Sequence, residues 1–216
     1  MSLGSYVRVA RHYIGQALQS KASLRREMTK IMAARDAHTD KLRALAERDG
    51  LTGLYSRKIF SDRLNEELRR ARRYGGDCGL IMFDLDHFKN INDSYGHPAG
   101  DKILRAVADI LAQQIRSSDI AARIGGEEFA VILPQTDKAG SLAEAERLRG
   151  LIAGIAREYG NVTLRVTASF GVAAFAENAK TIEELMSCAD QALYDAKNSG
   201  RNRVVASNQT TLAVAS

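Results

Sequence analysis

The sequence predicts an α+β domain, in which helices pack against a mixed or antiparallel sheet, with a long helix in front of it. Strand-like and helix-like segments alternate over most of the chain, which is typical of this class. Two adjacent glycines between apolar runs predict a β-hairpin, which an all-parallel sheet lacks. The 216 residues, 45% of them hydrophobic, are enough for one full domain and an appendage.

Residues 1–48 are expected to form one amphipathic helix. Between about residue 7 and residue 47 there is no proline, and seven of ten heptad a and d positions are apolar. The seven are Ile14, Ala17, Leu24, Met28, Ile31, Leu42 and Leu45, and the polar exceptions are Lys21, Arg35 and His38. We expect this helix to dimerise or to transmit a signal, and the alternative is a solvated connecting helix.

The domain itself is expected to span residues 49–207, followed by a polar tail at 208–216. Apolar residues three and four apart mark helices, which we place at 57–74, 98–115, 139–158 and 182–198. Short apolar runs between turn residues mark strands, which we place at 79–84, 119–124, 128–133, 162–175 and 202–206.

Turn chemistry sets two of these boundaries. Ser56 can cap the first helix, and Gly75-Gly76 can end it. Gly125 and Gly126 are expected to supply the positive φ angles of a tight hairpin turn. A hairpin tip without side chains would let a ligand approach the backbone closely.

The net charge of +5 lies in the N-terminal arm. Residues 1–48 carry ten basic and four acidic side chains, whereas the other 168 residues carry 21 and 22. The domain is therefore nearly neutral and the arm has few aromatic residues, so we expect no nucleic-acid partner. Cys78 and Cys188 stand far apart, which argues against a disulfide scaffold or a zinc site and favours a reducing cytoplasm. The sequence contains no run of about 18 apolar residues, the length that would predict a membrane span.

Acidic residues gather at two places that paired strands could bring together. Asp84 and Asp86 follow the first strand on the same side, where two carboxylates repel unless a cation joins them. Glu127 and Glu128 directly follow the two-glycine turn. Each pair alone is typical of a solvated strand end or a structural turn. Together they predict a site for Mg²⁺ and nucleotide phosphates, because hard oxygen ligands suit that ion.

Basic residues cluster where the last helix ends. Lys197 and Arg201 lie on either side of Gly200. Cations at this end complement the helix dipole, and they could equally hold a triphosphate. The spacing does not distinguish these two roles.

Four motifs in order resemble the GGDEF family of diguanylate cyclases. They are DGLTGLYSR, FDLDHFKNINDSYGHPAGD, RSSDIAARIGGEEF and ALYDAKNSGRNRV, and they run from Asp49 to about Val205. Residues 125–129 spell GGEEF, one of two forms of the signature in active members. Ser56 replaces the asparagine usual in the family, outside the catalytic positions. The resemblance implies a palm-like sandwich, with a central, mostly antiparallel sheet surrounded by helices, as in class III nucleotide cyclases.

The resemblance also implies an activity. A diguanylate cyclase condenses two GTP molecules into cyclic di-3′,5′-GMP and two pyrophosphates, in bacterial second-messenger signalling. Two Mg²⁺ per active site are implied as cofactors, with Mn²⁺ as an alternative. One domain holds one GTP, so a homodimer is required, and an upstream sensor domain could bring its two halves together. The protein would act in the cytoplasm, by itself or as the cytoplasmic part of a membrane-bound sensor.

Four positions are implied in metal binding and catalysis. Asp84, Glu127 and the carbonyl of Leu85 resemble the family's metal ligands. Glu128 resembles the second acidic residue of the signature, which assists metal binding or activates the 3′-hydroxyl group. The catalytic set implied by the resemblance is therefore Asp84, Glu127 and Glu128.

Five positions are implied in substrate binding. Lys89, Lys197 and Arg201 resemble the family's phosphate contacts, and Asn92 and Asp101 resemble its guanine contacts. The last pair is chemically sensible, because guanine offers N–H donors to a carboxylate and an O6 acceptor to an amide. Adenine would leave the carboxylate of Asp101 without a donor, so GTP is favoured over ATP.

An RxxD site that binds the inhibitory product is implied at Arg116 and Asp119, with Arg147 as its third member. A local ion pair at a helix-to-strand turn is the alternative for this motif. For the whole domain, a catalytically silent receptor of GTP or cyclic di-GMP is the alternative to an enzyme. The complete set of carboxylates favours the enzyme.

Overall fold

The computed structural model describes residues 47–175, 179 and 181–208, together with residues 28, 30 and 32. The chain divides into two units, Met1–Ala46 and Glu47–Ser216. In the first unit Met28, Lys30 and Met32 are helical and exposed. The rest of the predicted heptad seam, and the tail after residue 208, lie outside the described residues. No helix of the described residues is long and apolar enough to cross a membrane.

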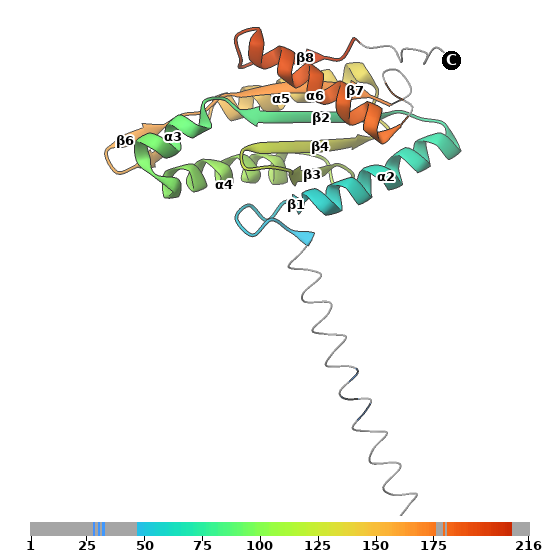
Figure 1. Ribbon diagram of the computed structural model, residues 1–216, viewed down its shortest axis with the longest axis horizontal. Coiled ribbons are helices and arrows are strands. Elements are labelled where there is room, and N and C mark those ends of the chain that lie inside the picture. Colours follow the sequence, from blue (N-terminus) through green and yellow to red (C-terminus); the bar gives the residue numbers. More distant parts are fainter. Residues whose placement is uncertain are drawn as a thin grey trace, which may run out of the picture. The chain divides into compact units, whose positions relative to one another are not determined.

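The second unit is built on a six-stranded sheet, in the spatial order β1-β3-β4-β2-β7-β8 (Figure 1). Its strands are β1 (Tyr55–Ser56), β2 (Cys78–Leu85), β3 (Ile120–Arg123), β4 (Glu128–Pro134), β7 (Ala168–Ala174) and β8 (Val204–Ala206). The central strand β2 is antiparallel to both β4 and β7, whereas the outer pairs β1-β3 and β7-β8 are parallel. The α+β class is confirmed, and the sheet is mixed.

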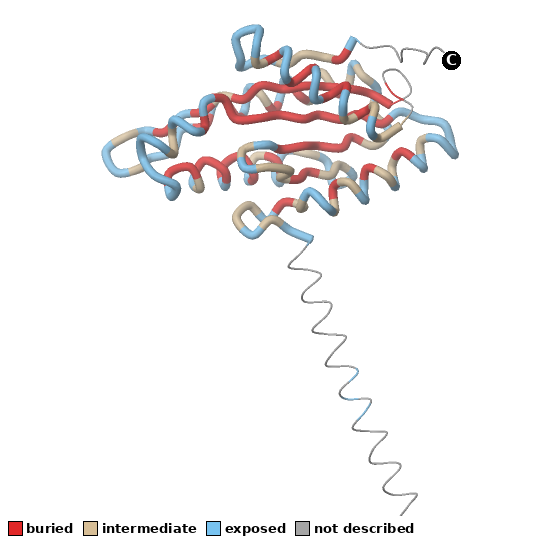
Figure 2. Tube along the Cα trace, in the orientation of Figure 1, coloured by how far each residue is buried: buried red, intermediate tan, exposed pale blue. Residues whose placement is uncertain are grey.

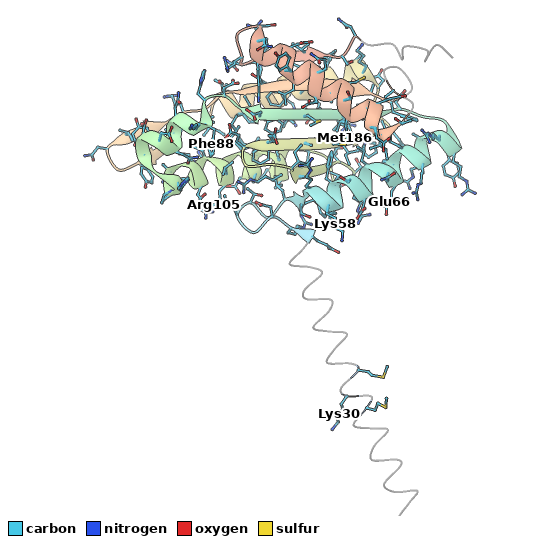
Figure 3. All side chains as sticks on the ribbon, viewed as in Figure 1. Lys30, Lys58, Glu66, Phe88, Arg105 and Met186 are labelled. Carbon is cyan, nitrogen blue, oxygen red and sulfur yellow. The ribbon has the colours of Figure 1, made fainter. Side chains whose placement is uncertain are left out.

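Five helices cover the two faces of this sheet. They are α2 (Arg57–Tyr74), α3 (Phe88–Tyr95), α4 (His97–Gln114), α5 (Lys138–Ala153) and α6 (Ile182–Asn198). Helices α2 and α6 pack on one face, which is the near face in Figure 1, and α3, α4 and α5 pack on the other. Phe88 and Met186, labelled in Figure 3, belong to these opposite faces.

Strand β2 is buried along its whole length, as is β7 (Figure 2). Side chains of a strand alternate between its faces, so both faces of β2 must be apolar. Ile81 and Phe83 contribute to the cluster under α3, α4 and α5, whereas Leu80 and Met82 contribute to the cluster under α2 and α6. This alternation sends the next residue, Asp84, toward the face that α6 covers.

Helix α6 approaches β7 so closely that only glycine fits at the contact. A Cβ atom on Gly171 would overlap the carbonyl oxygen of Ala189 and the backbone nitrogen of Leu193. The helix begins at a capping box, in which Thr181 and Glu184 each bond the other's backbone N–H. Its range and that of α2 agree with the predicted helices at 182–198 and 57–74.

The sequence prediction misses three elements. Residues 88–95 form α3, although only a turn was expected there. The predicted helix at 139–158 ends at Ala153, and a separate hairpin of β5 (Arg157–Tyr159) and β6 (Val162–Leu164) follows. Gly160, with a φ of 59°, forms the turn of that hairpin. The two-residue strand β1 was also not expected.

The expected reason for Gly125 and Gly126 is wrong. Neither residue has a positive φ angle. Gly125 instead lies against the Glu128 side chain, whose carboxylate a Cβ atom on Gly125 would overlap in its present position. A Cβ atom on Gly126 would have no protein atom within 4 Å, so the tip of this hairpin is open.

Candidate active site

Asp84 stands near the end of the central strand, between two other strands. It pairs with Glu128 of β4 on one side and with Ser169 of β7 on the other. Its residue surface is only 7% exposed, and its Oδ2 atom lies 3.0 Å from Nζ of Lys197. Lys197 comes from the last turn of α6. Sheet register and helix packing therefore bring together residues more than 100 positions apart.

The signature hairpin is closed and then fastened to β2 by backbone hydrogen bonds. The N–H groups of Ile124 and Gly125 both donate to the carbonyl of Glu128, at 2.9 and 3.3 Å. The N–H of Leu85 donates to the carbonyl of Glu127 at 3.3 Å. Glu127 is thereby placed beside the end of β2, next to Asp84 and Leu85.

The carboxylates at this point repel one another. Burial raises the pKa of Asp84, and Lys197 opposes that rise, while Glu128 and Asp86 add to it. Burial also raises the pKa of Glu127, and the charges of Asp84 and Glu128 raise it further. A group of crowded carboxylates held against one ammonium is an environment that favours an added cation.

The residues fit a metal that also binds substrate phosphates. No three acidic, histidine or cysteine side chains in the described part of the chain converge to hold an ion by themselves. The site offers instead the carboxylates of Asp84 and Glu127 and the backbone of Leu85. These are the hard oxygen donors that Mg²⁺ prefers, and Mg²⁺ commonly completes its coordination with water and phosphate oxygens.

One residue that the sequence reasoning missed holds this hairpin in place. Arg123 donates from Nη2 and Nε to the carbonyl of Gly126, at 2.7 and 3.2 Å. The same guanidinium lies 3.1 Å from Oδ1 of Asp49, the first residue of the domain motif DGLTG. Asp49 accepts two further bonds from Thr52. Both residues lie within the recognised motifs, but a signal for their pairing is absent because they are 74 positions apart.

The two guanine candidates lie near the junction of α3 and α4. Asn92 is on α3 and Asp101 is on α4, and both are half-buried. The Asn92 side chain lies so close to Gly100 that a Cβ atom there would overlap its amide oxygen. Asp101 is the next residue, and Arg105 lies 4.0 Å from its carboxylate. The structure thus places Asn92 and Asp101 near one another, on different helices.

The phosphate candidates are not all in one place. Lys197 pairs with Asp84, as described above. Arg201 lies in the loop after α6, with a left-handed φ of 62°, and its N–H donates to the carbonyl of Ala196 at 3.1 Å. Lys89 is exposed on α3, and no interaction joins it to Asp84 or Lys197 in the described residues.

The three candidates for the inhibitory site line one pocket of about 260 Å³. The N–H of Arg116 donates to Oδ2 of Asp119 at 3.0 Å. Burial raises the pKa of Asp119, against the hydrogen bond from Arg116. Arg147 reaches the pocket from α5 and bonds Glu144 and the carbonyl of Gln114, at 2.6 and 2.7 Å. The motif and its distant third member therefore share one surface, separate from Asp84.

Comparison with known proteins identifies relatives of the domain. Residues 46–203 match the family described as diguanylate cyclase, GGDEF domain. The diguanylate cyclase DgcP of Pseudomonas aeruginosa is 44% identical over 168 residues, which are 78% of this chain and 25% of DgcP. The response regulator PleD of Caulobacter vibrioides is 41% identical over 185 residues, which are 82% of this chain and 41% of PleD. This chain thus spans less than half of either relative.

Solved structures agree with this result. A crystal structure of the coiled coil and GGDEF domain of DgcB from Caulobacter crescentus, in complex with c-di-GMP, superposes with a TM-score of 0.77 at 32% identity. The match covers 86% of this chain and 98% of that one. The family match covers most of the chain, and it contains five of the six strands of the sheet, the signature hairpin and the carboxylate site. The chain belongs to the GGDEF-domain diguanylate cyclase family.

Proposed function

We propose that this domain condenses two GTP molecules into cyclic di-3′,5′-GMP, releasing two pyrophosphates. The observation that carries the proposal is the group of Asp84, Glu127 and Glu128, in which Asp84 faces Lys197, beside an open hairpin tip. A crowded set of acidic groups next to an ammonium suits a metal-bound triphosphate. The open position at Gly126 leaves room for a nucleotide to approach the backbone.

Each group has a role in this proposal. Asn92 and Asp101 bind the guanine edge, and Lys89, Lys197 and Arg201 bind phosphate oxygens. Asp84, Glu127 and the Leu85 carbonyl hold the metal, and Glu128 assists at the 3′-hydroxyl. Two Mg²⁺, or Mn²⁺ in their place, would lower the pKa of that hydroxyl and offset charge at the α-phosphate. The protein supplies orientation, because each hydroxyl must attack the phosphate of the other GTP.

The same proposal requires two copies of the domain. One domain holds one GTP, so the reacting pair forms only when two domains face each other as a homodimer. We propose that residues 1–48 connect the domain, at 49–207, to whatever brings the copies together, including an upstream sensor domain. Residues 208–216 are proposed as a tail. The reaction would take place in the cytoplasm, where GTP is available and where Cys78 and Cys188 stay reduced.

The direct test is incubation of the purified protein with GTP and Mg²⁺, followed by separation and mass identification of the nucleotides. Cyclic di-GMP and pyrophosphate in a ratio of one to two are expected. A protein that binds GTP or cyclic di-GMP tightly without turnover, even when dimeric, would be a receptor, and the proposed activity would be wrong.

Mg²⁺ is expected to stabilise the domain. Binding at the raised-pKa carboxylates relieves their repulsion, and each kcal/mol gained raises the unfolding temperature by roughly 2–4 °C in a domain of this size. Thermal unfolding with and without Mg²⁺ measures the shift. Asp84→Asn is expected to remove it, and an equal shift in that variant would contradict the assigned ligand.

This stabilisation is also expected to depend on pH. Ordinary carboxyl groups have pKa values of about 4. The pKa values of Asp84 and Glu127 are raised, so both groups take up protons at a higher pH than that. The gain from Mg²⁺ should be largest above the raised pKa values and fall as the pH drops through them. Without metal the sign reverses, since a raised folded-state pKa stabilises the protein in acid and that stability is lost as the pH rises. Unfolding temperatures across a pH series measure both trends.

Product inhibition is expected to depend on Arg116. Arg116→Ala removes a guanidinium that can form two hydrogen bonds to guanine or phosphate. The concentration of cyclic di-GMP that inhibits the variant should therefore be at least roughly tenfold higher than for the wild type. Initial rates at increasing product concentration measure this. Arg63→Ala, an exposed arginine of α2, is the control. Unchanged inhibition in Arg116→Ala would place the inhibitory site elsewhere.

A further inference from the structure

Asp86 is a buried carboxylate that the proposed reaction does not use. It is only 6% exposed, and its carboxylate oxygens accept hydrogen bonds from neutral groups. The hydroxyls of Thr167 and Ser169 donate to its two oxygens at 2.6 and 2.7 Å, and the backbone N–H of Asn202 donates at 3.0 Å. No basic side chain of the described residues forms an ion pair with it. Asp86, two positions after Asp84, therefore connects the end of β2 to the loop after α6.

Asn202 is held from two directions. Asp86 accepts a hydrogen bond from the backbone N–H of Asn202, and Nη1 of Arg149 on α5 donates to the side-chain oxygen of Asn202 at 2.7 Å. Glu146 holds the same arginine at 2.6 Å, so its guanidinium is oriented before it reaches the loop. The loop is thus bonded to the end of β2 and to α5 through a single residue.

The backbone of this loop needs such support. Arg201 and Asn202 have φ angles of 62° and 45°, and the left-handed conformation is unfavourable for arginine, whereas asparagine adopts it more readily. Two of them in succession persist only when the surroundings hold them. Asp86 and Arg149 supply the contacts that hold the second of the two.

Arg201 is the residue whose backbone position depends most directly on these contacts. It lies directly before Asn202, and its guanidinium makes no hydrogen bond or ion pair to another side chain of the described residues. The position of its Cα atom follows the backbone of the loop, so a shift of that backbone would move the whole side chain. The anchor of that backbone, Asp86, is two residues from the carboxylate that faces Lys197.

We propose that Asp86 and Arg149 are positioning residues, which fix the loop at 199–203 so that Arg201 faces the nucleotide phosphates beside Asp84. The proposal rests on the proposed function and deepens it, because it explains how one phosphate contact is oriented. Neither positioning residue touches the substrate. Their effect on nucleotide binding passes through Arg201.

The test compares how the protein binds a β,γ-imido analogue of GTP and GMP by calorimetry in Mg²⁺. Arg149→Ala is expected to weaken binding of the triphosphate analogue by about tenfold, approaching the loss in Arg201→Ala. The proposal assigns Arg201 to the β- and γ-phosphates, which GMP lacks, so GMP binding should stay unchanged. In the Arg201→Ala background, Arg149→Ala should cause no further loss, because its target is gone.

Asn202→Gly and Asp86→Asn give two more readouts. Asn202→Gly removes the acceptor of Arg149 and, because glycine adopts a φ of 45° without cost, adds no strain to the loop, so a loss of binding like that of Arg149→Ala is expected from the lost contact and the freer backbone. Asp86→Asn should weaken binding of the triphosphate analogue in the same way. If Asp86→Asn does not fold, Asn202→Gly still provides the test. Arg70→Ala, which breaks a similar i,i+3 ion pair on α2, is the matched control and should change nothing.

The outcomes separate this proposal from the proposed function. Equal losses for GMP and the triphosphate analogue, or additive losses in Arg149→Ala with Arg201→Ala, would overturn the positioning role and leave the activity standing. A wild-type protein that binds no GTP analogue would overturn the proposed function, and this proposal with it.

Discussion

Asp84→Asn is expected to lower the rate of cyclic di-GMP formation by roughly 1000-fold or more, with the fold intact. Asp84 is buried, faces Lys197 at 3.0 Å, and stands opposite Glu128 across the sheet. Asparagine keeps its shape but not the charge that would hold the metal. Initial rates at saturating GTP and Mg²⁺ measure the loss.

The stability of this variant separates chemistry from folding. Burial raises the pKa of Asp84, so its ionised form costs the fold free energy that asparagine does not. The unfolding temperature of Asp84→Asn without metal should therefore equal or exceed that of the wild type. Asp109→Asn, an exposed residue of α4, is the control and should be fully active. A tenth of wild-type activity or more in Asp84→Asn would contradict its assigned role.

Gly171→Ala is expected to destabilise the domain by about 3 kcal/mol, because overpacking costs 1–3 kcal/mol and more when backbone must move. The added methyl group would overlap backbone atoms of Ala189 and Leu193, and α6 cannot yield without leaving β7. Since α6 also carries Lys197, activity should fall together with stability. Urea unfolding of both proteins measures the difference.

Gly150, on helix α5, provides the control for Gly171, which lies on strand β7. A Cβ atom on Gly150 of α5 would have no neighbour within 4 Å, so Gly150→Ala should stabilise the domain by up to about 1 kcal/mol through helix propensity. The same substitution thus has opposite signs at the two positions. A Gly171→Ala variant as stable as the wild type would show that α6 is not seated on β7 as described.

The sequence was sufficient where a pattern is local and strong. Residues 79–84 form an apolar run between turn signals, and the strand is there with one more residue at each end. The helix at 182–198 has a capping threonine and a 3.6-residue apolar period, and its limits agree. The metal candidates come from the motifs that resemble the family, and their role as ligands stays a prediction.

Other features needed the folded chain. Helix α3 is short and rich in Asn and Asp, which favour turns, so its periodicity is too brief to detect. The contact of Gly125 with the Glu128 side chain depends on a side-chain position that no local rule gives. The partners of Asp86 lie 81, 83 and 116 positions away, so its role as an anchor follows only from the packing of β7 and the last loop.

Two copies of this domain are proposed to act together in converting GTP to cyclic di-GMP. The direct measurement is the initial rate of cyclic di-GMP formation over a wide range of protein concentration, with the molar mass determined by light scattering in parallel. We expect a rate that rises with the square of protein concentration while monomers predominate and becomes linear once dimers form. A monomer that makes cyclic di-GMP at a rate proportional to its concentration, or a dimer that makes none, would contradict it.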